Sequence, residues 1–136
     1  MSLSQSIVAL NSRGLAEIRG PDARDFLQGL ISNDVRLLAP DRAIHAALLT
    51  PQGKYLVDFF LYERDGVILL ETQADRLAEL VRRLLMYRLR ARVEIAEAQA
   101  PAVAVLIGAD APARVGLAAV AGAARLDGGV VVAVDP

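Results

Sequence analysis

Asp58, Phe60 and Tyr62 are the residues of this 136-residue chain whose types and spacing best suit ligand chemistry. They stand two positions apart within Tyr55 to Glu63, a segment rich in aromatic and branched residues that predicts a strand. Successive side chains of a strand point to opposite faces, so these three share one face, together with Leu56. The other face is expected to be core and to carry Tyr55, Val57, Phe59 and Leu61.

The dipeptide Asp65-Gly66 predicts a two-residue hairpin turn, because a type I′ turn needs positive φ angles at both positions. With this turn, Phe60 pairs with Glu71 and Tyr62 pairs with Leu69 in the next strand. Glu71 then joins the same face, which holds two carboxylates and two aromatic rings.

His45, the single histidine of the chain, falls in the preceding strand. A four-residue loop at Pro51 to Lys54 would place His45 opposite Phe60 and Ala47 opposite Asp58. A slip of one residue would reverse that facing, so the sequence leaves the position of His45 open.

A carboxylate beside aromatic rings suits a flat heterocycle that bears amino groups, because the rings offer stacking area and the carboxylate accepts from N–H groups. Pterins and nucleobases both have this chemistry. The same residues also fit a structural role, in which Phe60 and Tyr62 pack beneath another layer of protein and Asp58 caps a turn or pairs with an arginine. The residue pattern by itself leaves both interpretations open.

A second group of candidate residues is basic and lies in the helix and strand around positions 82 to 92. Cations in the last turn of a helix complement the negative end of its dipole, which explains part of the group as a solvated surface. The functional alternative is a site for an RNA backbone or for the carboxylates of a ligand tail. Nucleic acid is the weaker expectation, because only Tyr87 supplies aromatic area nearby. The group consists of Arg82, Arg83, Arg88, Arg90 and Arg92.

The composition is that of one globular domain, with 54% hydrophobic residues, 23% charged residues and a net charge of −1. Near-neutrality removes the overall field that nonspecific binders of nucleic acid or membranes use. Cysteine is absent and histidine occurs once, so no thiolate or multi-histidine metal site is predicted. The first residues lack a secretory signal and no apolar segment has the length of a membrane helix, so the expected location is the cytoplasm. A single lysine among many arginines, with abundant alanine, points to a bacterial source.

The order of the predicted elements favours an α+β fold, an antiparallel sheet with packed helices, because strands and helices follow one another without regular alternation. The first two predicted strands would form an opening hairpin around Gly14. The strands are expected at Ser6–Asn11, Leu15–Arg19, Ile44–Thr50, Tyr55–Glu63, Val67–Thr72, Arg92–Ala96 and Val103–Ile107, with a further strand among the valines of Val130 to Pro136.

Two helices are predicted between these strands. The first begins at Pro21 and is expected to end at the small polar residues Ser32, Asn33 and Asp34. The second extends from Asp75 to Leu89 and should pack one apolar stripe on the sheet. That stripe comprises Leu77, Leu80, Val81, Leu84 and Leu85.

Three segments together resemble the folate-binding relatives of the glycine-cleavage T-protein, an aminomethyltransferase: Gly20 to Val35, Ala47 to Lys54 and Asp58 to Tyr62. The YgfZ-type branch matches best, and the resemblance extends from about Ser6 to the end of the chain. It implies a GcvT-like folate-binding fold with tetrahydrofolate, or a one-carbon derivative of it, as the cofactor. Members are implicated in iron–sulfur cluster assembly or repair, with tRNA-modifying enzymes among the clients.

The resemblance also implies roles for individual residues. In the T-protein branch a Gly-Gly hairpin precedes two aspartates, of which the second contacts the folate; here these positions hold Gly53-Lys54 and Val57-Asp58. Asp58 would therefore contact folate, and it would be catalytic only in a transferase. The departures at Lys54 and Val57 make a classical aminomethyltransferase unexpected. The remaining implied folate contacts are Phe60, Tyr62, Glu71, Asn33 and Lys54.

The expected organisation of residues 1–136 is a single domain or the N-terminal part of such a protein. Residues 1–43 would form the opening hairpin and helix, residues 44–96 the meander, helix and strand, and residues 97–136 the start of a further, truncated segment. The YgfZ-type branch carries a later signature, Lys-Gly-Cys-Tyr-x-Gly-Gln-Glu, which has no counterpart in this cysteine-free chain.

The function expected from the residues and the resemblance is tetrahydrofolate binding in support of iron–sulfur cluster assembly or repair, with a link to tRNA modification. Folate and iron–sulfur client or assembly proteins are the expected partners, and a membrane is not. One alternative is a folate-dependent aminomethyltransferase of glycine cleavage. A second alternative is a non-enzymatic domain that binds RNA or protein through the basic patch of Arg82, Arg83 and Arg88.

Overall fold

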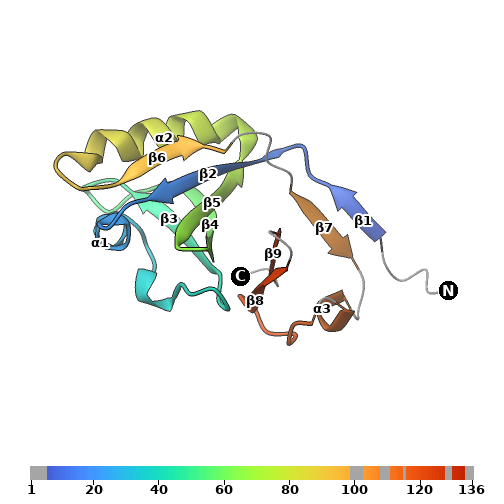
Figure 1. The fold of residues 1–136 in the computed structure, drawn as a ribbon. Coiled ribbons are helices and arrows are strands. Elements are labelled where there is room, and N and C mark those ends of the chain that lie inside the picture. The colour runs from blue at the N-terminus through green and yellow to red at the C-terminus, as the bar shows by residue number, and fades with distance from the viewer. Residues whose placement is uncertain (1–5, 99–102, 108–110, 115, 128–129, 134–136) are drawn as a thin grey trace.

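A computed structural model describes residues 6–98, 103–107, 111–114, 116–127 and 130–133. Its main body is a five-stranded antiparallel sheet of order β3-β4-β5-β2-β6, with the long helix α2 along one face (Figure 1). The strands are β2 (Arg13–Arg19), β3 (Ile44–Leu49), β4 (Tyr55–Arg64), β5 (Val67–Gln73) and β6 (Glu94–Glu97). The predicted α+β class with an antiparallel sheet is confirmed.

Helix α2 (Ala74–Arg88) follows β5 without a loop and packs on the sheet. Four residues of its predicted stripe are buried: Leu77, Leu80, Val81 and Leu84. The fifth is not, since Leu85 is 38% exposed. Leu85 follows Leu84 by one position and is therefore turned about 100° away from it, which places it at the margin of the stripe.

The core lies between α2 and the sheet and continues to the short helix α1 (Ala23–Gln28). Its largest fully buried side chains include Phe59 of β4, Ile18 of β2 and Leu27 of α1. No helix in the described part of the chain is long and apolar enough to span a membrane.

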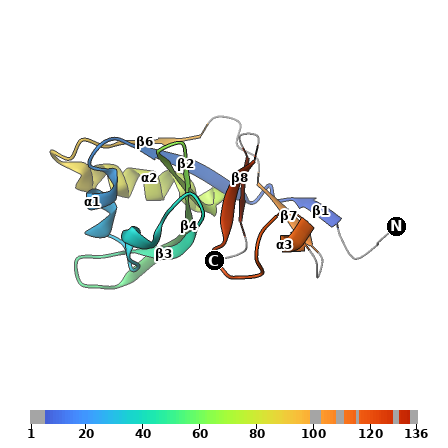
Figure 2. The ribbon, with the colours of Figure 1, turned by 60° about the horizontal axis from the view of Figure 1, so that its bottom comes forward.

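The predicted opening hairpin is wrong. The chain does turn before β2, where the amide of Arg13 donates to the carbonyl of Leu10 at 3.3 Å, but the two strands then diverge. Strand β1 (Ser6–Ala9) instead pairs antiparallel with the distant β7 (Ala104–Ile107), while β2 pairs with β5 and β6. Figures 1 and 2 show the β1–β7 pair beyond one end of the main sheet. A local turn does not decide pairing when both edges of the next strand are taken by other strands.

The first predicted helix is shorter than expected, because α1 ends at Gln28 with Gly29 as its C-cap. Ile31 already forms a β-bridge with Leu48. Asp34 then caps the following 3-10 helix, Val35–Leu37, by accepting a hydrogen bond from the amide of Arg36 at 3.0 Å. The polar turn therefore begins a new element rather than ending the old one.

The meander β3–β4–β5 has the predicted register. Phe60 pairs with both Glu71 and His45, one on each side of β4, and Tyr62 pairs with Leu69. Asp65 and Gly66 form the two-residue turn with φ angles of 52° and 79°. Both angles are positive, as a type I′ turn requires.

One irregularity interrupts the β3–β4 ladder. Leu48 pairs with Val57, but Leu49 pairs with Tyr55, which leaves Leu56 as an extra residue on β4. Such a β-bulge changes the alternation of side chains on the bulged strand. Leu56 accordingly packs against the hydrophobic core, and Tyr55 is 61% exposed. The sequence predicted that Leu56 shares a face with Asp58 and that Tyr55 lies in the core. Both predictions are wrong.

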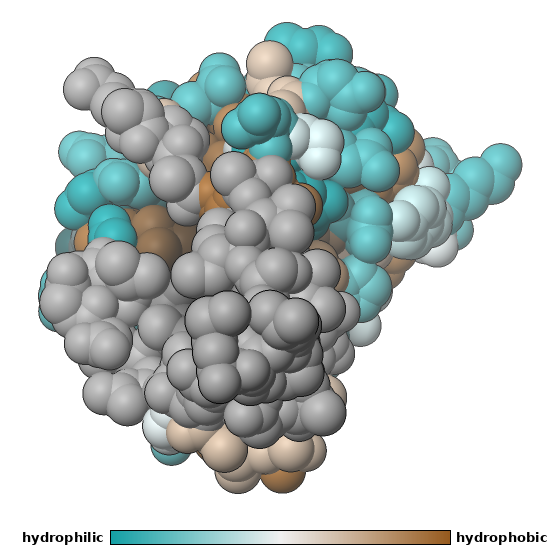
Figure 3. Space-filling model, turned by 90° about the vertical axis from the view of Figure 1, so that its right-hand side faces the viewer, coloured by the Kyte–Doolittle hydropathy of each residue, from teal (hydrophilic) through white to brown (hydrophobic). Residues whose placement is uncertain are grey.

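The later part of the chain contains the short helix α3 (Ala111–Arg114) and a hairpin of β8 (Ala124–Asp127) and β9 (Val130–Ala133). The segment before β8 meets the start of β3, where the amide of Ala43 donates to the carbonyl of Gly122 at 2.7 Å. The terminal strand predicted at Val130 to Pro136 is described through Ala133, and residues 134–136 lie outside the described residues. Viewed from the β1–β7 end, hydrophilic residues lie along the upper and right margins of the molecule (Figure 3).

Gly20 joins β2 to α1 at a point of close backbone approach. Its φ is +119°, and a Cβ there would lie 2.3 Å from the carbonyl oxygen of Arg92. We expect Gly20→Ala to lower the free energy of unfolding in urea by about 2–3 kcal/mol, because both the backbone angle and the space exclude a methyl group.

The matched control is Gly53→Ala in the β3–β4 turn. Gly53 also has a positive φ, +83°, but no atom lies within 4 Å of a Cβ there. This change should cost only the backbone strain of about 1 kcal/mol. Equal losses in the two variants would show that the contact with Arg92 does not constrain the fold.

Candidate functional site

The face of the sheet opposite α2 carries a half-exposed carboxylate and imidazole in direct contact. Nε2 of His45 lies 2.9 Å from Oδ2 of Asp58, and the two side chains are 46% and 48% exposed. His45 comes from β3 and Asp58 from β4. The β3–β4 register brings them together, since Ala47 pairs with Asp58 and His45 pairs with Phe60 on the same face.

Asp58 is held as a carboxylate by its neighbours. The hydrogen bond with His45 is the main cause that lowers the pKa of the Asp58 carboxyl below its ordinary value of 3.8; a hydrogen bond from Tyr55 adds to this, and partial burial opposes it. Asp58 is therefore ionised throughout the neutral pH range. An ionised carboxylate that keeps half of its surface open is a strong acceptor for N–H donors of a ligand.

Tyr55 reaches Asp58 because of the β-bulge at Leu56. Desolvation is the main cause that raises the pKa of the Tyr55 phenol above 10.0, and its hydrogen bond to Asp58 acts in the same direction. The phenol thus keeps its proton and donates to the carboxylate. The sequence placed Tyr55 in the core, and a bulge caused by one extra residue leaves no composition signal that could have corrected this.

Glu71, the second predicted carboxylate of this face, has a different environment. It is only 8% exposed, and both of its oxygens are occupied. Nε of Arg13 donates to Oε2 at 2.8 Å, and the Tyr62 hydroxyl donates to Oε1 at 2.8 Å. Glu71 and Tyr62 therefore meet on the predicted face, but their polar atoms satisfy each other and Arg13.

Phe60 lies between the two carboxylate groups. Its ring centroid is 5.1 Å from that of His45 at an interplanar angle of 44°, and the guanidinium carbon of Arg13 lies 5.7 Å from the same centroid. Arg13 is thus fixed by Glu71 and in cation–π range of Phe60. Arg13 is not among the site residues predicted from the sequence, which places it in a hairpin turn. The alternating pattern of β2 from Arg13 to Arg19 was the signal that could have found it.

Asn33 and Lys54, the other two predicted contacts, lie at the margin of this face. Nδ2 of Asn33 donates to the carbonyl of His45 at 2.8 Å, and its Oδ1 accepts from the amide of Asp34 at 2.7 Å. The Asn33 side chain thus joins the loop after α1 to β3. Lys54 is exposed in the β3–β4 turn, where its backbone pairs with Thr50.

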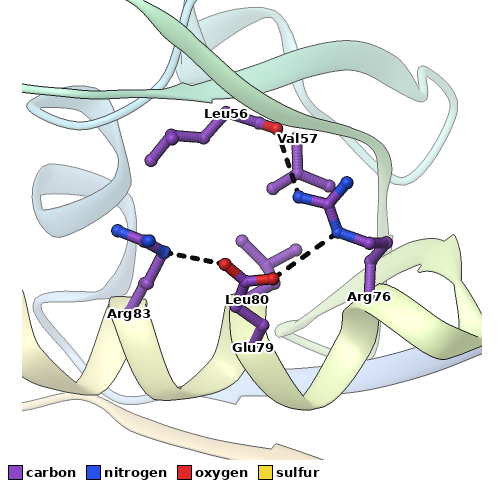
Figure 4. A pocket seen from close by; sticks show the side chains of 6 residues that line it. All are labelled: Leu56, Val57, Arg76, Glu79, Leu80 and Arg83. Atoms are coloured by element: carbon purple, nitrogen blue, oxygen red, sulfur yellow. Dashed lines mark hydrogen bonds and ion pairs between the residues drawn. The ribbon is translucent and has the colours of Figure 1, made fainter.

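The predicted basic patch lies on α2, away from Asp58. Arg82 and Arg88 are exposed, whereas Nε of Arg83 lies 3.2 Å from Oε1 of Glu79. Figure 4 shows a hollow between β4 and α2, and among its lining residues Glu79 forms ion pairs with Arg76 and Arg83. These pairs and the bond from Arg76 to the Leu56 carbonyl, 3.4 Å, leave the hollow's polar groups engaged with each other.

The described residues contain no cluster of three side chains that could hold a metal ion.

Comparison with solved structures identifies the fold. The crystal structure of the glycine cleavage system aminomethyltransferase T from Bartonella henselae superposes with a TM-score of 0.74, at 18% sequence identity, over 90% of this chain and 36% of that one. The chain has the fold of a part, about a third, of this aminomethyltransferase. The predicted GcvT-like fold is thereby confirmed.

The sequence is similar to iron-sulfur cluster assembly factors and to aminomethyltransferases. No protein-family model matches the chain. The mitochondrial iron-sulfur cluster assembly factor IBA57 of Mus musculus is 36% identical over 100 residues, which is 63% of this chain and 28% of that protein. Its homologue in Neurospora crassa is 31% identical over 100 residues, which is 68% of this chain and 23% of that protein. An aminomethyltransferase of Bordetella avium is 46% identical over 48 residues, which is 35% of this chain and 13% of that protein.

The predicted relationship to the T-protein holds, while the assignment to the YgfZ-type branch stays a prediction. The chain spans about a quarter of the length of the assembly factors that it matches. The cytoplasmic location expected from the sequence is wrong by this comparison, because these relatives are named as mitochondrial proteins. The expectation rested on the absence of a secretory signal and of a membrane helix, and neither absence distinguishes the cytoplasm from an organelle interior.

The hydrogen bonds that Arg13 and Tyr62 donate to the buried Glu71 should stabilise the fold. We expect Glu71→Ala to lower the free energy of unfolding by about 2–3 kcal/mol, because it removes two hydrogen bonds to a charged group and leaves Arg13 without its partner. Urea unfolding followed by circular dichroism measures the loss.

Glu79→Ala on α2 is the control, since Glu79 also pairs with arginines but is 42% exposed. Exposed ion pairs contribute little, so its loss should stay below about 1 kcal/mol. If the two variants unfold alike, the Arg13–Glu71–Tyr62 network does not support the candidate site.

Proposed function

We propose that this chain is the tetrahydrofolate-binding part of an iron–sulfur cluster assembly factor, with Asp58 as the polar anchor of the ligand. The observation that carries this proposal is the ionised, half-exposed Asp58 carboxylate, bordered by His45, Tyr55 and Phe60 on the sheet face opposite α2. The names of the relatives supply the cellular process.

The chemistry of this face fits a pterin ring. A pterin presents an amino group and a ring N–H on one edge, and a carboxylate with free lone pairs accepts from both. Phe60 and the exposed ring of Tyr55 offer apolar area beside that carboxylate. Glu71 and Tyr62 would support the site indirectly, because their mutual hydrogen bond and the bond from Arg13 to Glu71 hold the strand on which Phe60 lies. Direct folate contacts of these two residues, and of Asn33 and Lys54, remain predictions.

The proposed contribution to iron–sulfur cluster assembly is ligand binding rather than cluster ligation by this chain. The sequence contains no cysteine, so it supplies no thiolate to a cluster. Client or assembly proteins are the partners that this role requires, and the predicted link to tRNA modification would act through such clients.

Aminomethyl transfer is the second candidate function, because the fold and a 48-residue sequence match are shared with aminomethyltransferases. Against it stands Val57, where that branch would carry the first of two aspartates. Val57 is 7% exposed and belongs to the core. Of the two neighbouring positions, only Asp58 therefore places a carboxylate on the sheet face opposite α2. Ammonia release from an aminomethyl-lipoyl carrier, dependent on tetrahydrofolate, would favour this candidate.

Calorimetric titration with 5-formyltetrahydrofolate, a stable folate derivative, tests the proposed site. We expect saturable binding that Asp58→Asn weakens by about 1.5–3 kcal/mol, the contribution of hydrogen bonds to a charged group. Glu94→Gln provides the control, because Glu94 is an exposed carboxylate on β6, three strands away from β4 at the other edge of the sheet.

Binding that is weakened equally by the two substitutions, or by neither, would contradict the assignment of the ligand to Asp58. The cellular role has its own test. Cells depleted of their resident assembly factor should recover the activity of an enzyme that carries a [4Fe–4S] cluster when they express the full-length protein, and should fail to do so with its Asp58→Asn variant. Recovery by that variant would separate the cellular role from the proposed folate site.

A further inference from the structure

We propose that His45 is the positioning residue of this site: it holds the Asp58 carboxylate toward the ligand, and ligand binding weakens when its imidazole takes up a proton. This inference rests on the proposed function, because it concerns the same ligand. It goes beyond that function in naming a residue that controls orientation and pH dependence. The sequence left the position of His45 open, and only the observed register brings its ring to Asp58.

The backbone of His45 is held in place by two neighbouring segments. Its backbone lies in the β3–β4 ladder opposite Phe60, and its carbonyl accepts a hydrogen bond from Nδ2 of Asn33 at 2.8 Å. Its ring contacts the Phe60 ring, with 5.1 Å between centroids. The strand and the loop after α1 therefore fix the His45 backbone, and the Phe60 ring contacts the imidazole whose Nε2 lies 2.9 Å from Asp58.

The hydrogen bonds of His45 and Tyr55 restrict the Asp58 carboxylate. The terminal torsion of an aspartate is broad, so an isolated exposed carboxylate samples many orientations and loses this freedom when it binds a ligand. A carboxylate offers about four lone-pair positions on its two oxygens. His45 occupies one on Oδ2 and the Tyr55 hydroxyl takes another. These two bonds restrict the orientation of the carboxylate, while 48% of the Asp58 side chain stays exposed.

The protonation of His45 changes the net charge of the His45–Asp58 pair. Imidazole changes its charge between about pH 5 and 8, unlike the other side chains that face it. Asp58 stays ionised and Tyr55 stays neutral across that range. Arg13, on the other side of Phe60, is paired with Glu71. The loop after α1 adds Asp34, which is paired with Arg36.

When His45 is neutral, the His45–Asp58 pair therefore carries one negative charge and attracts N–H donors of a ligand. When His45 is protonated, the pair is neutral, and the imidazolium competes with the ligand for the same carboxylate. Binding should accordingly be stronger at pH 7.5 than at pH 5.5. No other histidine in the chain could contribute to this difference.

The test titrates 5-formyltetrahydrofolate into the full chain and two variants at pH 5.5, 6.5 and 7.5. His45→Ala removes the contact to Asp58 and should weaken binding about tenfold at pH 7.5, the lower end of the effect of a hydrogen bond to a charged group. His45→Gln keeps an N–H donor that does not titrate, so it should bind within about threefold of the wild type at pH 7.5 and should lose most of the pH dependence. Any dependence that remains in His45→Gln measures the titration of the ligand itself.

A second measurement needs no ligand and separates this inference from the proposed function. Carbon-13 NMR titration of the Asp58 carboxyl should show a pKa below its ordinary value in the wild type, because of the His45 hydrogen bond first and the Tyr55 bond second. The pKa should return toward 3.8 in His45→Ala.

Absence of folate binding by the wild type would overturn the proposed function and, with it, the role of His45 toward that ligand. Binding that is equal in wild type and His45→Ala, or stronger in His45→Ala, would overturn the inference alone. An Asp58 pKa that does not change in His45→Ala would also overturn it, because His45 would then not hold the carboxylate.

Discussion

The pairing register of β4 with its two neighbours is the constraint on which the candidate site depends. Phe60 stands opposite His45 on one side and Glu71 on the other, and the whole polar face follows from these two pairings. A shift of one residue would turn Asp58 into the core and Phe59 toward solvent. Two things prevent this shift: the Asp65-Gly66 turn fixes the β4–β5 pairing, and the buried side of β4, with Phe59 and Leu61 fully enclosed in the core, cannot face water.

Asp58 and Glu71 lie on the same face, but burial gives them different roles. Glu71 is 8% exposed, and its two oxygens accept hydrogen bonds from Arg13 and Tyr62, so it stabilises the sheet. The Asp58 side chain is 48% exposed, and its partners, His45 and Tyr55, leave part of the carboxylate open. A buried carboxylate without partners would be costly, whereas an exposed one with two donors is both ionised and available. The face therefore combines a rigid support with one accessible acceptor.

The sequence predicted much of the fold, and its failures have identifiable causes. The strands β3, β4 and β5, the turn between β4 and β5 and the helix α2 follow from alternation, turn residues and helical periodicity. The opening hairpin failed because β1 found its partner β7 nearly one hundred residues away. Tyr55 was misplaced because the bulge at Leu56 breaks the strict alternation on which its assignment rested. Each failure concerns an interaction between segments that local patterns do not describe.

The sequence by itself determined that Asp58, Phe60, Tyr62 and Glu71 share a face, because a strand alternates and a two-residue turn sets the pairing of its neighbours. It also suggested the relationship to the T-protein through motifs that lie close together in the chain. The tertiary structure alone decided which of these side chains stay accessible, since Arg13 arrives from β2 to occupy Glu71 and His45 arrives from β3 to meet Asp58. Accessibility and charge depend on which strands lie side by side, and that is a property of the assembled sheet, which no single segment encodes.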